Sequence, residues 1–224
     1  MTASWKNAAM AEARLDFMVP GKPAFVLASQ SRVRATMLAN AGLNPHIEPA
    51  HVDEDEVKHA MKAEGAPPAH IAETLAEMKA LKVSHKLTAR GITQAMVLGA
   101  DQMLDCNGVL FDKPEDLDHA KAHLKALSGK THALISAAVV ARDGQPIWRH
   151  IARARLTVRP LSDGFIDAYL DAVGELALTS VGAYQVEGLG IHLFSAIEGH
   201  QSVIQGLPLL ELLDFLRANS MIPQ

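Results

Sequence analysis

The sequence has a single cysteine, few aromatic residues and no long hydrophobic run. One cysteine, Cys106, excludes an internal disulfide and any cysteine-rich zinc site, and it suits the reducing cytoplasm. No apolar run approaches the roughly 20 residues that a membrane-spanning helix needs, so we expect a cytoplasmic protein with no membrane partner. The net charge is -4 and there is no basic tail, which argues against a nucleic-acid partner.

What is present is typical of a globular protein. Hydrophobic residues make up 49% of the 224 residues and charged residues 21%, which suits one large domain or one two-lobed unit. Charged residues interrupt the alanines of residues 1–22, so this segment lacks the continuous apolar core of a signal peptide. We expect residues 1–22 to form a short helix or frayed arm outside the domain, and residues 23–224 to form the domain itself.

The stretch of greatest chemical interest is residues 97–102, which end in Asp101 and Gln102. An apolar run that ends abruptly in an acid and an amide is typical of a buried strand that delivers a carboxylate to the edge of a sheet. Further along the chain, Asn107-Gly108 predicts a hairpin turn, and the pair Lys113-Pro114 follows it. We expect the other residues of chemical interest to be brought close to Asp101 by the fold.

A first strand at residues 24–28 is followed by Ser29, Ser31 and a predicted helix over residues 32–41. Serine hydroxyls and the free N–H groups of a helix N-terminus suit the oxygens of a phosphate. A cation in the first turn, such as Arg34, gains nothing from the helix dipole, which indicates that an anion binds there. The alternative is two ordinary capping serines beside solvated arginines.

Four acidic residues at 53–56 precede another helical stretch. They form a favourable first turn of a helix, although one of them can also reach a metal ion. After a break at residues 65–68, Ile71, Leu75 and Met78 predict a helix up to about residue 87, and Lys79 borders its apolar stripe. A lysine in that position either extends its amine to solvent or points into a site.

The remaining pattern is that of an α/β protein. We expect a helix over residues 115–127, two long strands over 133–141 and 146–158, a helix over 163–172, a strand over 191–197 and a terminal helix over 207–216. The glycine-rich residues 180–190 are interpreted as a binding loop. Residues 128–132 look like the end of a phosphate-binding P-loop, but Leu124 occupies the position of its first glycine, so they are not one. Alternating strands and helices with one long hairpin predict a mixed sheet.

Several separated motifs together resemble the Maf family of nucleoside triphosphate pyrophosphatases, over residues 23–217. The matching stretches are residues 27–31, 98–102, 113–114, 127–132, 182–184 and 206–208. The resemblance implies an elongated, two-lobed α/β fold, with a mixed sheet flanked by helices, similar to inosine triphosphate pyrophosphatases. It also implies a homodimer, a Mg²⁺ or Mn²⁺ ion, and hydrolysis of a nucleoside triphosphate to the monophosphate and pyrophosphate.

The resemblance implies roles for individual residues as well. Asp101 matches the catalytic acid that activates water, and Lys79 and Lys113 match catalytic lysines that hold the phosphates. Glu54 matches a carboxylate that binds the metal together with Asp101, although Asp53 and Asp55 compete for that role. The positions that match substrate-binding residues are Ser29, Ser31, Arg34, Gln102 and Glu187.

Two departures from the family pattern bear on specificity. Arg32 and Val33 stand where the family commonly has a proline and the first of two arginines. Glu187 stands where members acting on thymidine and uridine triphosphates carry glutamine. A carboxylate offers only acceptors, so it suits a base with two donors, such as guanine. We therefore predict that Val33 and Glu187 set the specificity and that the base is guanine-type. The subfamily acting on 7-methylguanosine triphosphate looks similar in both departures, although Val33 supplies no aromatic platform for its cationic base.

Two alternatives remain open at this point. The first is a nucleotide-binding regulator of cell division without significant turnover, since the family name derives from inhibition of septum formation. Retention of Asp101, Lys79 and Lys113 favours the enzyme, because a regulator needs no water-activating acid beside two lysines. The second is an unrelated phosphatase, which would release inorganic phosphate in place of pyrophosphate.

Overall fold

The computed structural model describes residues 16–224, so most of the expected N-terminal arm lies outside the described residues. The strands are β1 (Phe25–Leu27), β2 (His46–Ile47), β3 (Met96–Cys106), β4 (Val109–Phe111), β5 (Thr131–Arg142), β6 (Gln145–Val158) and β7 (Phe194–Glu198). The helices are α1 (Arg32–Asn40), α2 (Glu54–Ala63), α3 (Pro68–Ala89), α4 (Leu117–Leu127), α5 (Asp163–Val173), α6 (Gln201–Ile204) and α7 (Leu209–Ala218). Short 3₁₀ turns occupy residues 174–179, 181–183 and 189–193.

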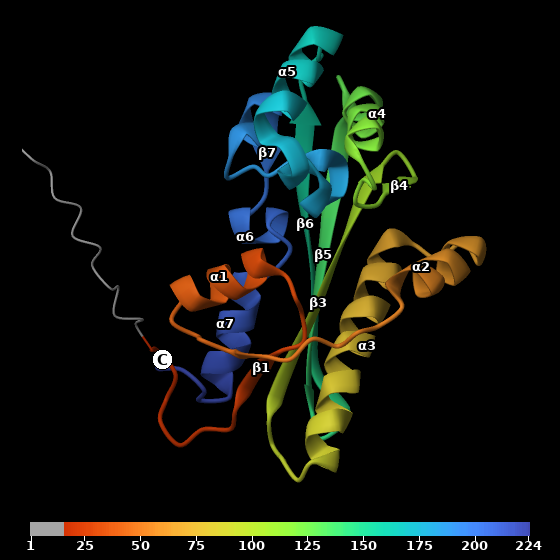
Figure 1. Cartoon of the computed structure of the whole chain (residues 1–224). Coiled ribbons are helices and arrows are strands. Elements are labelled where there is room, and N and C mark those ends of the chain that lie inside the picture. The colour runs from red at the N-terminus through yellow and green to blue at the C-terminus, as the bar shows by residue number, and fades with distance from the viewer. Residues whose placement is uncertain (1–15) are drawn as a thin grey trace, which may run out of the picture.

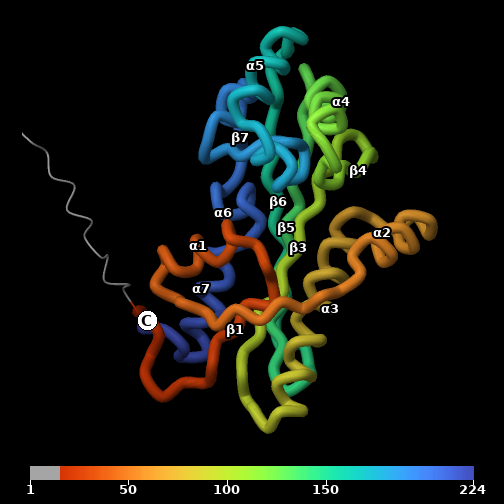
Figure 2. The backbone as a smooth tube through the Cα atoms, in the orientation of Figure 1, coloured from red at the N-terminus to blue at the C-terminus, as the bar shows by residue number. Residues whose placement is uncertain are grey.

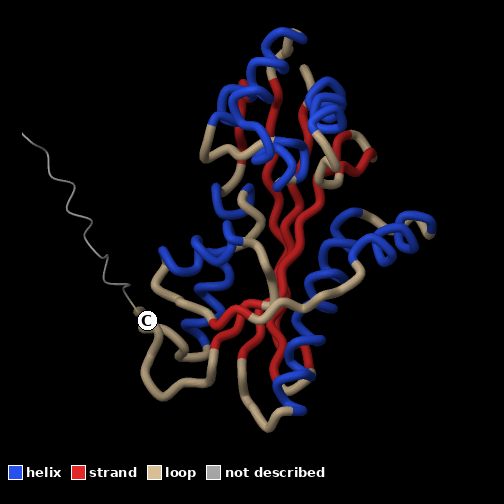
Figure 3. The backbone as a smooth tube through the Cα atoms, viewed as in Figure 1, coloured by secondary structure: helices blue, strands red, loops and turns tan. Residues whose placement is uncertain are grey.

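In this part of the chain the strands form one seven-stranded sheet, in the order β2-β1-β3-β5-β6-β7 with β4 paired to β3. β1 runs parallel to β2 and β3, and the other pairs are antiparallel. Figure 3 shows the strands running lengthwise through an elongated molecule. The predicted α/β fold with a mixed sheet is confirmed.

The helices predicted after Ser31 and Ser162 are confirmed, and the acidic residues at 53–56 do begin a helix. Ser31, Asp53 and Ser162 are the N-caps of α1, α2 and α5, and each side chain accepts a hydrogen bond from the backbone of the first turn. The two predicted hairpin turns, at residues 107–108 and 143–144, have positive φ at both positions, as a tight two-residue turn requires. Of the helices in the described part, none is long and apolar enough to cross a membrane.

The sheet lies between separate hydrophobic cores. α1 and α7 pack on β1 and part of β3 in one lobe, while α4 and α5 cover the other end of the sheet in the second lobe (Figure 2). α3 lies along the opposite face and packs on β3 and β5. Ala100 belongs to the core of the first lobe and Leu104 to that of the second. Asp101 therefore lies where the two lobes meet.

The expectation that the strand ends at Asp101 is wrong. β3 continues to Cys106, and Asp101 pairs with Ala137 of β5 in the middle of the ladder. On its other edge, however, β3 pairs with β1 only as far as Leu98 and with β4 only from Leu104. Asp101 thus lies beside a gap between the two strands that pair with this edge, and not at the end of its own strand.

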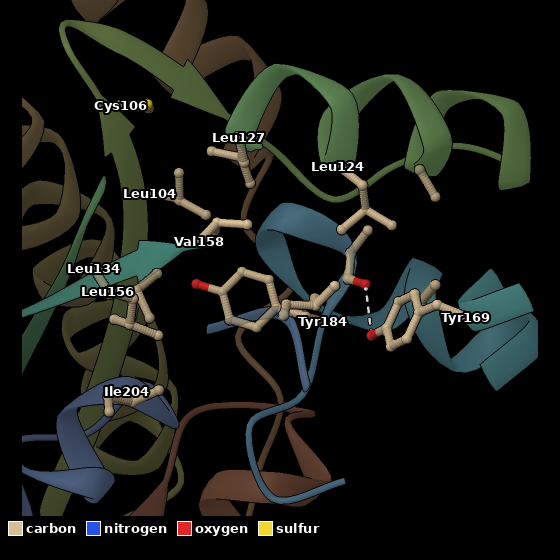
Figure 4. Packing of buried hydrophobic residues seen from close by; sticks show 14 of the residues in the cluster. Leu104, Cys106, Leu124, Leu127, Leu134, Leu156, Val158, Tyr169, Tyr184 and Ile204 are labelled. Carbon is tan, nitrogen blue, oxygen red and sulfur yellow. Dashed lines mark hydrogen bonds between the residues drawn. The ribbon is translucent and has the colours of Figure 1, made fainter. Parts of the chain in front are cut away.

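The expectation that residues 180–190 form a simple binding loop is wrong in its first part. Gly182, Ala183 and Tyr184 are buried, and Figure 4 shows Tyr184 among the leucines of β3, β5, β6 and α4. Gly182 has a φ of 78°, and a Cβ there would lie 2.6 Å from a methyl group of Leu104. Gly182 therefore allows a close approach of this segment to the core.

Acidification is expected to destabilise the fold through His132, which contacts the hydroxyl of Tyr184 at 2.6 Å. Burial lowers the pKa of His132 from its ordinary value of 6.5 to about 4. Between these two values the unfolded chain binds a proton that the folded protein does not. The free energy of unfolding should therefore fall as the pH drops from 6.5 to 4, by up to roughly 3 kcal/mol. Denaturant titrations over this range measure the decline.

The matched variant is His132→Gln, whose amide keeps a hydrogen-bonding group near Tyr184 but does not titrate. Its unfolding free energy should vary less with pH over the same range. If the unfolding free energies of the two proteins varied equally with pH, the assignment of the effect to His132 would be contradicted.

Candidate active site

The site depends on a close approach between α3 and β3. A Cβ on Gly99 would lie 2.1 Å from the carbonyl oxygen of Ala76 and 2.7 Å from the backbone nitrogen of Ala80, so only glycine allows this packing. Lys79 lies between these two α3 residues, and Asp101 is two residues beyond Gly99 on the same face of β3. The glycine therefore brings the lysine against the acid.

Lys79 lies between two carboxylates. Its Nζ is 2.6 Å from Oδ1 of Asp101 and 2.8 Å from Oε1 of Glu54. The side chains of Lys79 and Asp101 are 9% and 7% exposed, whereas that of Glu54 is 39% exposed. Burial acts to raise the pKa of Glu54, but attraction and a hydrogen bond from Lys79 outweigh it and hold the pKa below its ordinary value. Glu54 is therefore held as an anion at neutral pH, and Lys79 places a positive charge against Asp101.

Asp101 keeps one oxygen available for chemistry. Its Oδ2 is buried and has no hydrogen-bond partner among the described residues. Such an oxygen can accept a proton from water or bind a cation. The described residues contain no group of three or more histidine, cysteine or acidic side chains that could hold a metal. Glu54 and Asp101 alone fit a hard cation such as Mg²⁺, which binds through one or two carboxylates and completes its shell with waters and phosphate oxygens.

Arg34 occupies the gap in the edge of β3. Its Nη1 donates to the carbonyl of Ala100 at 3.0 Å, and its Nε donates to the carbonyl of Gly206 at 2.9 Å. Burial lowers the pKa of Arg34, while attraction to Asp101 and Glu54 acts in the opposite direction. A guanidinium remains charged in proteins, so Arg34 adds a second cation to the site.

The other polar residues predicted for the site differ in how far their hydrogen-bonding groups are already used. Ser29 and Ser31 accept backbone hydrogen bonds within the loop before α1, and neither hydroxyl proton has an acceptor in the described chain. Gln102 donates its amide to Ser136 and to the carbonyls of Val203 and Ile204, each at 3.0 Å, so its NH₂ group is already engaged. Its predicted role in substrate binding stays a prediction.

Lys113 is not brought into the cluster. It is exposed, and among the described residues it forms no ion pair or hydrogen bond. It lies two residues after β4, in the loop that leads to α4. Its amine is free to meet an incoming anion, and its predicted catalytic role also stays a prediction.

The two residues predicted to set specificity share one groove. It has a volume of about 490 Å³, and it is lined by Arg32, Val33, Thr36, Met37, Asn40, Ala41, Glu187, Gln205 and Leu209. Val33 precedes Arg34 and Gln205 precedes Gly206, so the groove adjoins the charged cluster at two points. A groove of this size can hold a base while the cluster receives its phosphates.

Two features of the site were not assigned from the sequence. Gly99 and Gly206 lay within recognised motifs, but nothing in the sequence showed what either glycine contacts. Gly206 has a φ of 95°, and a Cβ there would lie 3.1 Å from Nη2 of Arg34. A glycine within a motif is a signal that another part of the chain approaches its backbone closely. Only the fold identifies which part that is.

Comparisons with known proteins place the chain in a family. The family model described as "Maf-like protein" matches residues 24–219. A nucleoside triphosphate pyrophosphatase of Paramagnetospirillum magneticum is 53% identical over 87% of this chain and 97% of its own length. A 7-methyl-GTP pyrophosphatase of Rhizobium meliloti is 48% identical over 88% of this chain and 96% of its own. Another protein of that name, from Brucella abortus, is 47% identical, with the same coverage of both chains.

Proposed function

Since this chain belongs to the Maf-like family, we propose that it is a nucleoside triphosphate pyrophosphatase whose preferred substrate carries a guanine-type base. It is a hydrolase that converts a nucleoside triphosphate and water to the monophosphate and pyrophosphate. The observation that carries this function is the buried, unpartnered Oδ2 of Asp101 beside the Lys79 ammonium. The homodimer expected from the family stays a prediction.

In the proposed mechanism Asp101 acts as the general base. Lys79 holds Oδ1 at 2.6 Å, which fixes the orientation of the carboxylate. We assign Oδ2, which has no hydrogen-bond partner among the described residues, to accept the proton of the attacking water. Because phosphoryl transfer needs little covalent chemistry, positioning of the water and charge stabilisation supply most of the rate enhancement.

A triphosphate carries about four negative charges, and several donors of this site suit them. The free hydroxyl protons of Ser29 and Ser31 and the guanidinium of Arg34 lie at the first loop, and Lys113 is exposed after β4. Glu54 and Asp101 would hold a Mg²⁺ or Mn²⁺ ion, which neutralises phosphate charge when it is bound. The lysines and the arginine would orient the phosphates.

The base is proposed to lie in the groove between Val33 and Glu187. The carboxylate of Glu187 is exposed there and can accept hydrogen bonds from the N1–H and amino groups of guanine. A methyl group at N7 makes guanine cationic, which favours a carboxylate further. Two of the relatives described above carry the name 7-methyl-GTP pyrophosphatase, which supports 7-methyl-GTP as the substrate.

Replacement of Glu187 by glutamine should shift the base preference. In a panel of 7-methyl-GTP, GTP, dTTP, UTP, CTP and ATP, the wild type should give its highest kcat/KM with one of the two guanine nucleotides. Glu187→Gln should reduce that advantage over dTTP by about tenfold or more, because the amide places a donor where the base also has one.

The control is Glu198→Gln, the same change at an exposed position of β7 away from the groove. It should leave the ranking of substrates as it is in the wild type. If dTTP is the best substrate and Glu187→Gln does not improve it, the proposed base is wrong. Binding of nucleotides with no turnover would instead support the regulator of cell division.

A further inference from the structure

α2 carries Glu54 at its first position but packs only lightly against the rest of the fold. None of its residues is buried, and only Val57 and Met61 pack in part against the core under α3. In Figure 1 the helix projects away from the sheet beside one end of α3. Since 39% of the Glu54 side chain is exposed, its contact with Lys79 is not enclosed by a core. Polar contacts must therefore contribute to the placement of this helix.

Two lysines of α2 supply such contacts. Lys58 and Lys62 are one turn apart, so their side chains share a face of the helix. Lys58 Nζ lies 3.0 Å from Oδ1 of Asp112, and Lys62 Nζ lies 3.0 Å from Oδ2 of the same carboxylate. Both oxygens of one acid are thus engaged by one helix, which fixes the helix in rotation as well as in distance.

The partner of these lysines, Asp112, is the neighbour of a residue predicted for the site. Asp112 follows the last residue of β4 and directly precedes Lys113. The pairs Lys58–Asp112 and Lys62–Asp112 therefore join the helix that begins with Glu54 to the loop that carries Lys113. Asp112 is 54 residues after Lys58 and 50 after Lys62, and no strand pairing joins the two segments.

Burial and charge distinguish this contact from an ordinary surface ion pair. The side chain of Lys58 is only 16% exposed, and those of Lys62 and Asp112 are 35% and 43% exposed. Burial acts to lower the pKa of Lys58, but its hydrogen bond to Asp112 outweighs this and raises the pKa, with further attraction from Asp101 and Glu54. Lys58 is thus electrostatically coupled to the catalytic acids as well as to Asp112.

We propose that Asp112 is a positioning residue, which clamps α2 to the Lys113 loop through Lys58 and Lys62 and so places Glu54 and Lys113 on either side of the phosphates. The clamp itself is independent of the proposed function, but its effect on catalysis rests on that function. Without the Asp112 charge, Lys58, Lys62 and Lys113 repel one another, and α2 loses its link to the loop.

Hydrogen exchange of the full-length protein tests the clamp without any substrate. In Asp112→Asn, peptides covering residues 54–63 should exchange roughly tenfold faster than in the wild type, while those of β3 and β5 should not change. Asp112→Glu, which keeps the charge, should restore most of the protection. The matched control is Asp163→Asn, which removes the exposed partner of Lys125 and should leave the exchange of α2 unchanged. Unchanged exchange of α2 in Asp112→Asn would overturn the proposal.

Kinetics of the same variants test the consequence for catalysis. Asp112→Asn should lower kcat/KM for the best triphosphate of the panel about tenfold and should raise the Mn²⁺ concentration needed for half of the maximal rate, since Glu54 is less well placed. Asp112→Glu should restore most of the kcat/KM and bring the Mn²⁺ requirement back close to that of the wild type. Faster exchange with unchanged kinetics would overturn the positioning role. A wild type that lacks turnover would contradict the proposed function, whereas the exchange comparison would still decide whether the clamp exists.

Discussion

Replacement of Asp101 by asparagine is expected to lower kcat by about 10²–10⁴-fold, the range that removal of a general base produces. Asparagine has the same shape, and its oxygen can still accept the hydrogen bond from Lys79. The group at the position of Oδ2 then becomes an NH₂, which cannot accept a proton from water. Steady-state kinetics with the preferred triphosphate and Mn²⁺ measure the loss, while the fold should be retained.

The matched control is Asp105→Asn on the same strand. Asp105 accepts a hydrogen bond from Gly108 in the turn after β3, away from the charged cluster. We expect its kcat to stay within about twofold of the wild type, because it neither contacts Lys79 nor faces the gap in the sheet. An Asp101→Asn enzyme with wild-type kcat would remove Asp101 from the role of base.

Replacement of Lys79 by methionine is expected to reduce both activity and stability. Methionine fills a similar volume but leaves Asp101 buried without its cation and close to Glu54. Loss of one partner of a buried ion pair costs about 3–5 kcal/mol in the free energy of unfolding. Loss of the ammonium that orients Asp101, and that is predicted to hold the phosphates, should also lower kcat by about 10²–10³-fold. Denaturant titration and steady-state kinetics measure the two effects.

A double variant separates the two effects of Lys79. Lys79→Met combined with Asp101→Asn leaves no buried charge unpaired, so much of the stability should return while the activity stays low. Lys82→Met is the control on the same helix, because Lys82 is exposed and donates to the carbonyl of His51. A Lys79→Met protein as stable as the wild type, or a double variant less stable than both single variants, would contradict this account of the pair.

Much of the fold was predictable from the sequence because local signals agreed with it. The capping residues Ser31 and Ser162, the two-residue turns and the apolar runs are local features that the fold retains. The extent of β3 was not predictable, since the strand continues past a buried acid only because β5 pairs with residues 97–105. Tyr184 was likewise assigned to a loop, although its burial depends on packing from four distant elements.

The site was predictable in its members more than in its geometry. The residues alone left Lys79 undecided between solvent and the site, because the answer depends on how closely α3 approaches Gly99. Arg34 was expected to bind an anion, but two of its donors bond backbone carbonyls in a gap that only the sheet register reveals. Asp112 gave no signal in the sequence, since its partners lie on a helix far along the chain.

Identification of the reaction products tests the central claim most directly. The wild type, incubated with 7-methyl-GTP or GTP and Mn²⁺, should convert the triphosphate to one equivalent of monophosphate and one of pyrophosphate, resolved by chromatography. The Asp101→Asn protein should form the same products at a rate lower by about 10²-fold or more. Formation of a nucleoside diphosphate and inorganic phosphate, or tight binding with no product at all, would contradict a pyrophosphatase built around Asp101.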